Sequence, residues 1–244
     1  MRKMEQGTRA LIVLRDMILS GSLRPGERVL ELALVDKLQI SRTPIRYALA
    51  KLADEGLLEH AGGGFAVREF TGREIRDAIR LRGAIEGMAA RTAAERDSPS
   101  DLLQLAWKCI DELERVLRMR SIGPSQIEKY LSINGRFHAH LLGLSGSFIL
   151  QRAINNVCSL PFASPNAFVM ARRDKGEIYK VMFISQYQHR TMLEAIENRD
   201  GARAEAIARE HAELSLSAVS LILEAPQDFD GVPGFNLLAE TEEA

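Results

Sequence analysis

Cysteine is scarce in this sequence of 244 residues, which contains only Cys109 and Cys158 and no Cys-x-x-Cys spacing. A disulfide framework or a zinc site built from thiolates needs more cysteines, or cysteines at closer spacing, so the sequence argues against both. A chain with so few cysteines fits a reducing compartment, and we expect a cytoplasmic protein.

Long hydrophobic runs are also absent. A membrane-spanning helix needs about 18 or more consecutive apolar residues, and no run of that kind occurs. The apolar patch near the N-terminus is interrupted by Arg15 and Asp16, which is too broken for a secretory signal peptide. We therefore expect neither a signal peptide nor a membrane partner.

Neither sign of charge dominates, because 32 Lys and Arg stand against 33 Asp and Glu and give a net charge of -1. A balanced total does not exclude nucleic-acid binding, since a few well-placed arginines can suffice. With 46% hydrophobic and 27% charged residues, the composition is that of an ordinary globular protein. The length allows one large domain or two ordinary ones.

Three helices are predicted in the first 55 residues. Apolar residues recur at helical spacing from Thr8 to Leu19, and again from Leu30 to Leu38. A third helix begins in the segment Ser-Arg-Thr-Pro at 41–44. Ser41 or Thr43 can cap it, and Pro44 sits in the first turn, where its missing N–H costs nothing.

The third helix has an apolar face and a polar face. Ile45, Leu49 and Leu52 share one side at 100° per residue, while Thr43 and Arg46 point away from it. Side chains at the start of a recognition helix reach base edges in the major groove, and arginine can bond guanine bidentately. This helix is therefore a candidate reader of DNA.

Two short segments after Gly56 flank three consecutive glycines, Gly62 to Gly64. Glycine permits the positive φ angles and the close backbone approach of a tight β-hairpin. Helix, helix, turn, helix and hairpin make a winged helix-turn-helix over residues 1–70. Arg42 and Arg46 alone could simply be solvated surface arginines, but together with this order of elements they favour DNA binding.

The run ILSGSLRPGERVLELALVDKLQISRTPIRYALAKLADEGLLEHAGGGFAV resembles the N-terminal domain of GntR-type bacterial transcription regulators. Their pattern contains PGxxL, then S/T-R-T-P-V-R-x-A-L-x-x-L, and then a glycine wing. Leu32 stands where some relatives carry an arginine. The resemblance implies DNA contacts by Ser41, Arg42, Thr43 and Arg46, with Gly62 or Gly63 in the wing.

The rest of the chain is predicted to be an all-α antiparallel bundle over residues 71–224, so the fold is mainly α. Residues 225–244 lose helical periodicity, and we expect a flexible tail there. The predicted helices are Thr71 to Arg96, Ser100 to Met119, Ser125 to Leu144, Ser147 to Leu160, Lys175 to Asn198 and Gly201 to Leu223.

Three histidines form a candidate metal site in this bundle. Asn134 and His138 are four residues apart and share a helix face. His189 and His211 lie at about equal distances from the turn at Gly201, so antiparallel helices would place them level with one another. Neutral imidazoles suit zinc or nickel, and Asn134 could add a carbonyl oxygen. The alternative is a set of ordinary hydrogen-bonded histidines.

This second part resembles the ligand-sensing FCD-type domain of the FadR branch of the same family. The resemblance rests on the segment Arg82 to Glu86, on Asn134 to His138, and on the later histidines. Asn134 replaces an aspartate found in many members. An arginine fork can bind a carboxylate bidentately, so we expect Arg82 to bind the carboxylate of the effector. The alternative is an ordinary intrahelical ion pair with Glu86.

The segments NGRFH and LPFASPNAF look most similar to the vanillate-regulator subgroup, which implies an aromatic effector with Phe162 or Phe168 facing its ring. We therefore expect a homodimeric repressor that is not an enzyme, binds double-stranded operator DNA and is released by a small carboxylic acid. A metal-dependent hydrolase is the main alternative, although no general base is evident beside the histidines. A pure metal sensor is the other.

Overall fold

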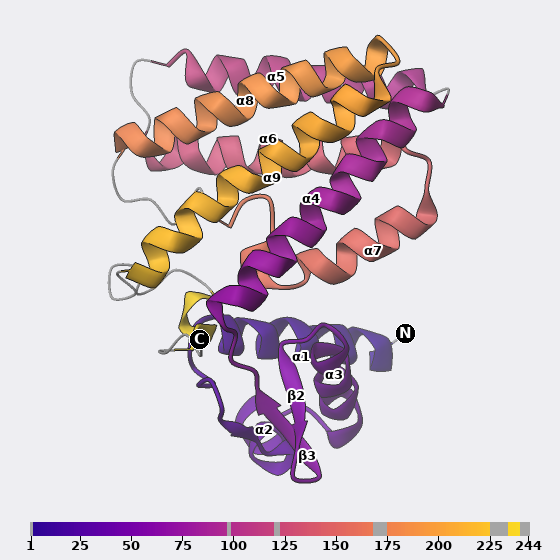
Figure 1. Cartoon of the computed structure of the whole chain (residues 1–244). Coiled ribbons are helices and arrows are strands. Elements are labelled where there is room, and N and C mark those ends of the chain that lie inside the picture. Colours follow the sequence, from indigo (N-terminus) through magenta and orange to yellow (C-terminus); the bar gives the residue numbers. More distant parts are fainter. Residues whose placement is uncertain (1, 97–98, 120–122, 168–174, 225–233, 240–244) are drawn as a thin grey trace. The chain divides into compact units, whose positions relative to one another are not determined.

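The computed structural model describes residues 2–96, 99–119, 123–167, 175–224 and 234–239. The chain divides into two compact units, whose elements are labelled in Figure 1. Unit 1 comprises Met1–Ile75, Ser159–Phe162 and Ala225–Ala244, and unit 2 comprises Arg76–Cys158 and Ala163–Glu224.

Unit 1 has the predicted order of helices and hairpin. Its first helix begins well before Thr8, where apolar periodicity starts. The elements are α1 (Arg2–Leu19), β1 (Arg28–Val29), α2 (Glu31–Leu38), α3 (Arg42–Asp54), β2 (Leu58–Ala61) and β3 (Gly64–Val67). This arrangement confirms the prediction of a winged helix-turn-helix.

Helix α3 packs on α1 through the predicted apolar face. Ile45, Leu49 and Leu52 are fully or almost fully buried, whereas the Arg46 side chain faces solvent. Ser41 occupies the N-cap position, but its hydroxyl makes no capping hydrogen bond, in contrast to the sequence-based expectation. The orientation of α3 therefore depends on its buried face and not on its cap.

The wing is a three-stranded antiparallel sheet in the order β1-β3-β2. Arg28 of β1 and Glu59 of β2 both lie opposite Ala66 of β3. The hairpin turns at Gly62 and Gly63, whose φ angles are +54° and +80°. Both angles lie in the left-handed region that glycine adopts without steric cost, so these two positions require glycine.

The C-terminal segment departs from the sequence-based expectation. Residues 234–239 pack in unit 1 and include a short 3-10 helix, η3 (Phe235–Leu237), with Leu237 fully buried. The backbone N–H of Phe70 donates to Leu237 O at 2.8 Å, and Asn236 Nδ2 donates to Ile18 O at 2.9 Å. The expectation of a flexible tail does not hold for this stretch, while 225–233 and 240–244 lie outside the described residues.

Unit 2 is helical apart from its connections, as predicted, and the helix bounds agree with the predicted ones to within two residues. Helix α4 starts in unit 1 and continues into unit 2. The elements are α4 (Gly72–Glu95), α5 (Ser100–Leu117), α6 (Pro124–Leu144), α7 (Phe148–Cys158), η1 (Pro161–Ala163), α8 (Lys175–Glu197) and α9 (Gly201–Glu224).

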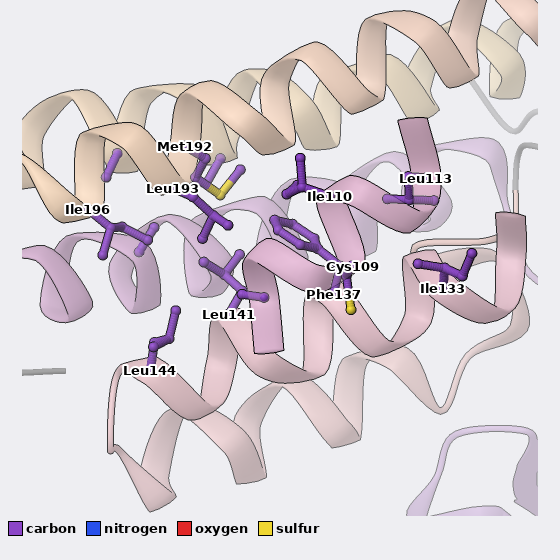
Figure 2. Close-up of a cluster of buried hydrophobic side chains, with 14 of the residues drawn as sticks. Cys109, Ile110, Leu113, Ile133, Phe137, Leu141, Leu144, Met192, Leu193 and Ile196 are labelled. Atoms are coloured by element: carbon purple, nitrogen blue, oxygen red, sulfur yellow. The ribbon is translucent and has the colours of Figure 1, made fainter. Parts of the chain in front are cut away.

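The core of unit 2 lies where α5, α6 and α8 meet, as Figure 2 shows. Each helix contributes one apolar stripe, and burial of such side chains stabilises the fold by about 25 cal/mol per Å². The labelled members are Cys109, Ile110, Leu113, Ile133, Phe137, Leu141, Leu144, Met192, Leu193 and Ile196. In the described part of the chain, no helix has both the length and the apolar character needed to cross a membrane.

Two glycines let α4 approach α9 closely. A Cβ added at Gly83 would lie 2.7 Å from Ala212 Cβ, and one added at Gly87 would lie 3.1 Å from Arg209 Cγ. Arg82 and Glu86 are the immediate neighbours of these glycines in sequence. The close crossing therefore brings both charged side chains towards His211, one residue before Ala212 on α9.

Candidate functional site

A groove of about 680 Å³ in unit 1 joins the start of α2, the start of α3 and the wing. Its lining includes the two arginines of the recognition helix and the glycines of the hairpin tip. The residues that matter below are Arg28, Glu31, Leu32, Arg42, Arg46 and Gly62. The structure thus brings together recognition-helix and wing residues that the sequence places about 20 positions apart.

All six predicted DNA-binding residues are exposed, namely Ser41, Arg42, Thr43, Arg46, Gly62 and Gly63. The side chains of Arg42 and Arg46 are 64% and 71% exposed. Apart from Gly63 and its chain neighbours, none of the described residues comes within 4 Å of a Cβ built at Gly63, so the hairpin tip is open to an approaching backbone. This geometry suits major-groove contacts by α3 and phosphate or minor-groove contacts by the wing.

Glu31, the first residue of α2, was not anticipated from the sequence. One carboxylate oxygen lies 3.4 Å from Arg42 Nε and the other lies 3.3 Å from Arg46 Nε. One carboxylate therefore holds both guanidinium groups of the recognition helix at the same edge of the groove. The pairing joins two helices, so periodicity within one helix gives no sign of it.

Arg28 is a second residue that the sequence reading missed. A Cβ at Gly62 would lie only 2.5 Å from Arg28 Nη2, so this guanidinium rests against the hairpin tip. In the described part of the chain its exposed side chain has no hydrogen bond or ion pair. Leu32, which replaces an arginine of some relatives, is 62% exposed on the same groove. Arg28 therefore supplies a positive charge to this groove, in which Leu32 replaces the arginine of some relatives.

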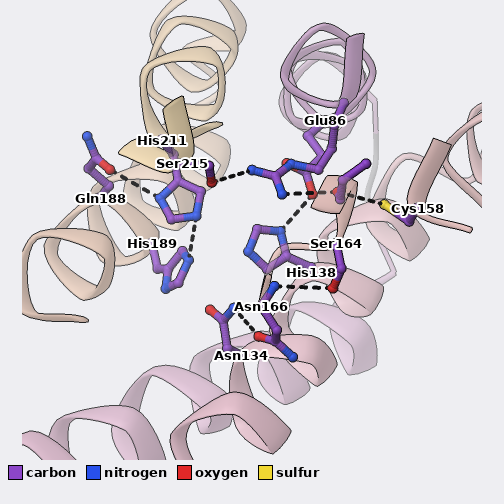
Figure 3. A network of polar contacts seen from close by, with 12 residues as sticks. Glu86, Asn134, His138, Cys158, Ser164, Asn166, Gln188, His189, His211 and Ser215 are labelled. Atoms are coloured by element: carbon purple, nitrogen blue, oxygen red, sulfur yellow. Dashed lines mark hydrogen bonds and ion pairs between the residues drawn. The ribbon is translucent and has the colours of Figure 1, made fainter. Parts of the chain in front are cut away.

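The three predicted metal-ligating histidines meet inside unit 2, as Figure 3 shows. His138 comes from α6, His189 from α8 and His211 from α9, and all three are buried. The Nε2 atoms of His189 and His211 are 3.1 Å apart, which agrees with the predicted level placement. One ring nitrogen from each residue lies within 4.8 Å of the other two.

The environment keeps two of the rings neutral. Burial lowers the pKa of His189 well below its usual value, and the charges of His211 and His138 lower it further. Burial and the charge of His138 lower the pKa of His211 to about 3, against an opposing effect of Glu86. A neutral imidazole has a free lone pair, which is the form that binds a metal ion.

Hydrogen bonds fix the tautomers of two histidines. His138 Nδ1 lies 2.8 Å from Glu86 Oε1, and His211 Nδ1 lies 3.1 Å from Gln188 Oε1. Burial alone raises the pKa of Glu86, but the charge and hydrogen bond of His138, with the charge of Arg82, lower it to about 2. The ionised carboxylate only accepts, so His138 donates from Nδ1 and its Nε2 is left without a partner.

Asn134, which Figure 3 shows near the histidines, has a buried side-chain oxygen without a partner among the described residues. Its Nδ2 donates to Asn166 Oδ1 at 2.8 Å, while its buried Oδ1 has no hydrogen-bond partner. A zinc–nitrogen bond of about 2.1 Å places neighbouring ligand atoms roughly 3 to 3.5 Å apart, which fits the spacing of His189 and His211. Three imidazole nitrogens and one amide oxygen are a donor set that fits zinc or nickel.

Arg82 is 1% exposed and lies beside this cluster in the hydrogen-bond network. Its two terminal nitrogens donate to Ala163 O at 3.1 Å and to Ser215 Oγ at 3.0 Å. Its Nε has no hydrogen-bond partner and lies 3.7 Å from Glu86 Oε2. The structure is therefore compatible with both interpretations of Arg82. It forms the ion pair with Glu86, and it retains one unsatisfied N–H that a carboxylate effector could use.

Other residues named from the sequence lie elsewhere. His60 is on β2 in unit 1, where its ring packs against Phe65. Phe162 belongs to unit 1 and packs edge-on against Phe70, so it is not part of the histidine cluster of unit 2. Phe168 lies outside the described residues.

Several characterised regulators are similar in sequence. The Nta operon transcriptional regulator of Aminobacter aminovorans is 31% identical over 142 residues, covering 58% of this chain and 64% of that protein. The HTH-type transcriptional regulator McbR of Escherichia coli (strain K12) is 29% identical over 145 residues, covering 59% and 63%. The chain thus spans just under two thirds of the length of these relatives.

Solved structures share the fold. The structure of E. coli McbR/YncC superposes with a TM-score of 0.61 at 20% identity, covering 88% of this chain and 97% of that one. A putative transcriptional regulator GntR from Rhodococcus sp. RHA1 gives a TM-score of 0.54 at 20% identity, covering 91% and 99%. At such identities the likeness concerns the fold alone.

Two family models match the two parts of the chain. The model for the FCD domain matches residues 77–214, and the model for bacterial regulatory proteins of the gntR family matches residues 9–67. The second description names regulatory proteins, and neither description names an enzyme. Together with the winged helix-turn-helix and the helical bundle, these matches show that the chain belongs to the GntR family of bacterial regulators and carries an FCD domain.

Proposed function

We propose that this protein is a DNA-binding transcription regulator, acting as a homodimeric repressor that a small carboxylic acid releases from its operator. The observation that carries the proposal is the exposed pair Arg42 and Arg46 beside a glycine wing, in a chain that also buries a three-histidine cluster. The first feature supplies DNA contacts, and the second supplies a place to sense a ligand.

Dimerisation follows from the size of the DNA-binding unit. One winged module offers few base contacts, whereas a two-fold dimer doubles them on a pseudo-palindromic operator. Light scattering of the full chain, free and with DNA, is expected to give twice the monomer mass of 27.1 kDa for the protein component. A monomer in both states would contradict the dimer.

The metal site is the sensing element in this proposal. His138, His189 and His211 would hold a divalent transition ion through ring nitrogens, with Asn134 Oδ1 as the fourth donor. When bound, the ion supplies a Lewis-acidic position for an anionic oxygen. The chain's own part is to keep His189 and His211 neutral by burial, and to orient the rings of His138 and His211 through Glu86 and Gln188.

Arg82 gives the site selectivity for a carboxylate. Its guanidinium is buried and retains an unsatisfied Nε–H, and an arginine fork binds carboxylates bidentately. A bound carboxylate must compete with Ala163 O, Ser215 Oγ and Glu86 for this side chain. Such an exchange changes DNA affinity only if the ligand favours one arrangement of the protein over another. The vanillate-type resemblance is the basis for proposing an aromatic acid.

The two alternatives make different predictions. A hydrolase needs a general base within reach of the metal, and the buried carboxylate beside the histidines, Glu86, is already paired with His138 and Arg82. The family matches also favour regulation over catalysis. A pure metal sensor would release DNA on addition or removal of the metal alone, without any carboxylate.

The test begins with an operator selected from random duplexes by the full chain. Gel-shift titrations of this operator are then repeated with vanillate, benzoate, citrate or lactate, each with and without Zn²⁺ or Ni²⁺. We expect at least one acid to weaken binding only in the presence of metal, and Arg82→Ala to abolish that response. Failure to select any sequence would contradict DNA-specific regulation. If none of the four acids changed DNA binding, the proposal of a carboxylate effector would be wrong.

A further inference from the structure

The side-chain amide of Asn134 has two chemically different ends. Its oxygen carries lone pairs and can ligate a metal ion, whereas its NH₂ group carries hydrogens and cannot. An aspartate at this position would present an oxygen in both orientations of its side-chain carboxylate. With asparagine, coordination depends on whatever holds the amide in the correct orientation, and the two orientations have almost the same shape.

A chain of hydrogen bonds sets this orientation. It starts at the backbone carbonyl of Leu131, which can only accept, so Asn166 must donate to it from Nδ2, at 3.0 Å. The other end of that amide, Asn166 Oδ1, then accepts from Asn134 Nδ2 at 2.8 Å. The Leu131 carbonyl has no hydrogen to donate, so it fixes the direction of both hydrogen bonds. Asn134 Oδ1 takes part in neither of them.

Asn166 is itself held in place. Its backbone N–H donates to Ser164 Oγ at 3.2 Å, within the segment that follows η1. Asn134 is 3% exposed, and its Oδ1 has no partner in the described part of the chain. A buried carbonyl oxygen without a partner is unfavourable, so an orientation that leaves one needs a compensating ligand. The His138 ring lies one helical turn further along α6 and also leaves a nitrogen unpaired.

We propose that Asn166 is a positioning residue that makes Asn134 an oxygen donor to the metal site, and so gives three ring nitrogens and one oxygen. The inference rests on the metal binding proposed above. Without Asn166, the amide of Asn134 can turn over and direct its NH₂ group at the histidines. Residues that orient metal ligands typically change metal affinity by about 10- to 100-fold when removed.

The test compares Zn²⁺ affinities of full-length variants by competition with a chromophoric chelator. Asn166→Ala is expected to bind Zn²⁺ at least about tenfold more weakly than the unmodified chain. Asn166→Asp keeps an acceptor for Asn134 Nδ2 and is expected to bind more tightly than Asn166→Ala. Asn155→Ala, on the exposed side of α7, is the matched control and is expected to have unchanged affinity. Asn166→Ser, which cannot span Leu131 and Asn134, serves as a second loss variant if Asn166→Ala does not fold.

A double-mutant cycle separates positioning from a general structural effect. If Asn166 acts through Asn134, its replacement has no further effect on Zn²⁺ affinity in an Asn134→Ala background. The role of Asn166 would be wrong if its replacement lowered Zn²⁺ affinity equally in the Asn134→Ala background. It would also be wrong if Asn166→Ala and Asn166→Ser both bound Zn²⁺ as tightly as the unmodified chain. Neither result would contradict metal binding itself. Absence of Zn²⁺, Ni²⁺ and Co²⁺ binding by the unmodified chain would overturn both.

Discussion

At the scale of single residues, one acid and three arginines line the groove that we propose to bind DNA. Glu31 holds Arg42 and Arg46 at 3.4 and 3.3 Å, so the two cations are partly ordered before DNA arrives. Pre-ordering lowers the entropy lost by long side chains on binding. The same carboxylate is expected to repel phosphates and so to limit binding to DNA of the wrong sequence.

Arg46 is expected to read a base. Replacing Arg46 by alanine removes a side chain that is exposed on the outer face of α3 and leaves the buried face intact, so the fold should persist. Loss of a bidentate base contact costs about 1–3 kcal/mol of operator affinity. Gel-shift titration checks this, with Arg118→Ala, at the exposed C-cap position of α5, as the control. Equal loss of affinity for selected and random duplexes would instead make Arg46 a phosphate contact.

Arg28 is expected to contact a phosphate. Its guanidinium rests on the hairpin tip and has no hydrogen bond or ion pair with any residue that the structure describes. Arg28→Ala should weaken binding to selected and random duplexes by similar factors. It should also reduce the slope of log affinity against log salt by about 0.9, the value for one phosphate contact. An unchanged slope would exclude Arg28 from the DNA contacts.

At the scale of elements, the start of α4 is fixed by a capping box. The N–H of Thr71 donates to Glu74 Oε2 at 2.9 Å, and the N–H of Glu74 donates to Thr71 Oγ1 at 3.2 Å. Burial raises the pKa of Glu74, but the Thr71 backbone and Arg68 more than offset this and lower it. A lowered folded-state pKa adds stability above the unfolded pKa, and this stability is lost as pH falls through the folded value.

Removal of this cap is expected to destabilise the protein moderately. Thr71→Ala or Glu74→Ala should each lower the free energy of unfolding by about 0.5–2 kcal/mol, and the double variant should lose less than the sum. Urea denaturation at pH 7 measures this. Glu74→Gln keeps the cap geometry but removes the charge, so it should be less stable than the unmodified chain at pH 7 and should lack the loss of stability in acid. Additive losses would show that the two side chains act independently.

At the scale of the whole molecule, metal removal is expected to lower thermal stability. An ion that binds only the folded state at 100 times its dissociation constant stabilises that state by about 2.7 kcal/mol. Chelation should therefore lower the melting temperature of the unmodified chain. In His140→Ala, a variant outside the cluster, the chelator should lower the melting temperature by a similar amount. In His189→Ala the melting temperature should already be lower, and the chelator should not change it further. A response of His189→Ala equal to that of the unmodified chain would contradict the site.

Much of the fold could be predicted from the sequence because local periodicity determines it. Ile45, Leu49 and Leu52 repeat at helical spacing, so the buried face of α3 and the exposure of Arg46 follow from geometry alone. Equal spacing from the turn at Gly201 likewise predicted that His189 and His211 would meet. These features depend on one helix, or on two helices joined by a short turn.

The tertiary structure decided the contacts between distant segments. Glu86 meets His138 across 52 positions, and Asn134 meets Asn166 across 32, so neither pair leaves a periodic signal. Residues 234–239 carry no periodic pattern and yet bury Leu237, since a few apolar residues can fill a core gap without being helical. The sequence by itself determined the elements, the exposed face of α3 and the three histidines that we propose as metal ligands. Only packing decided which buried donor forms a hydrogen bond with which acceptor, because a buried donor pairs with an acceptor that the neighbouring helices bring within reach.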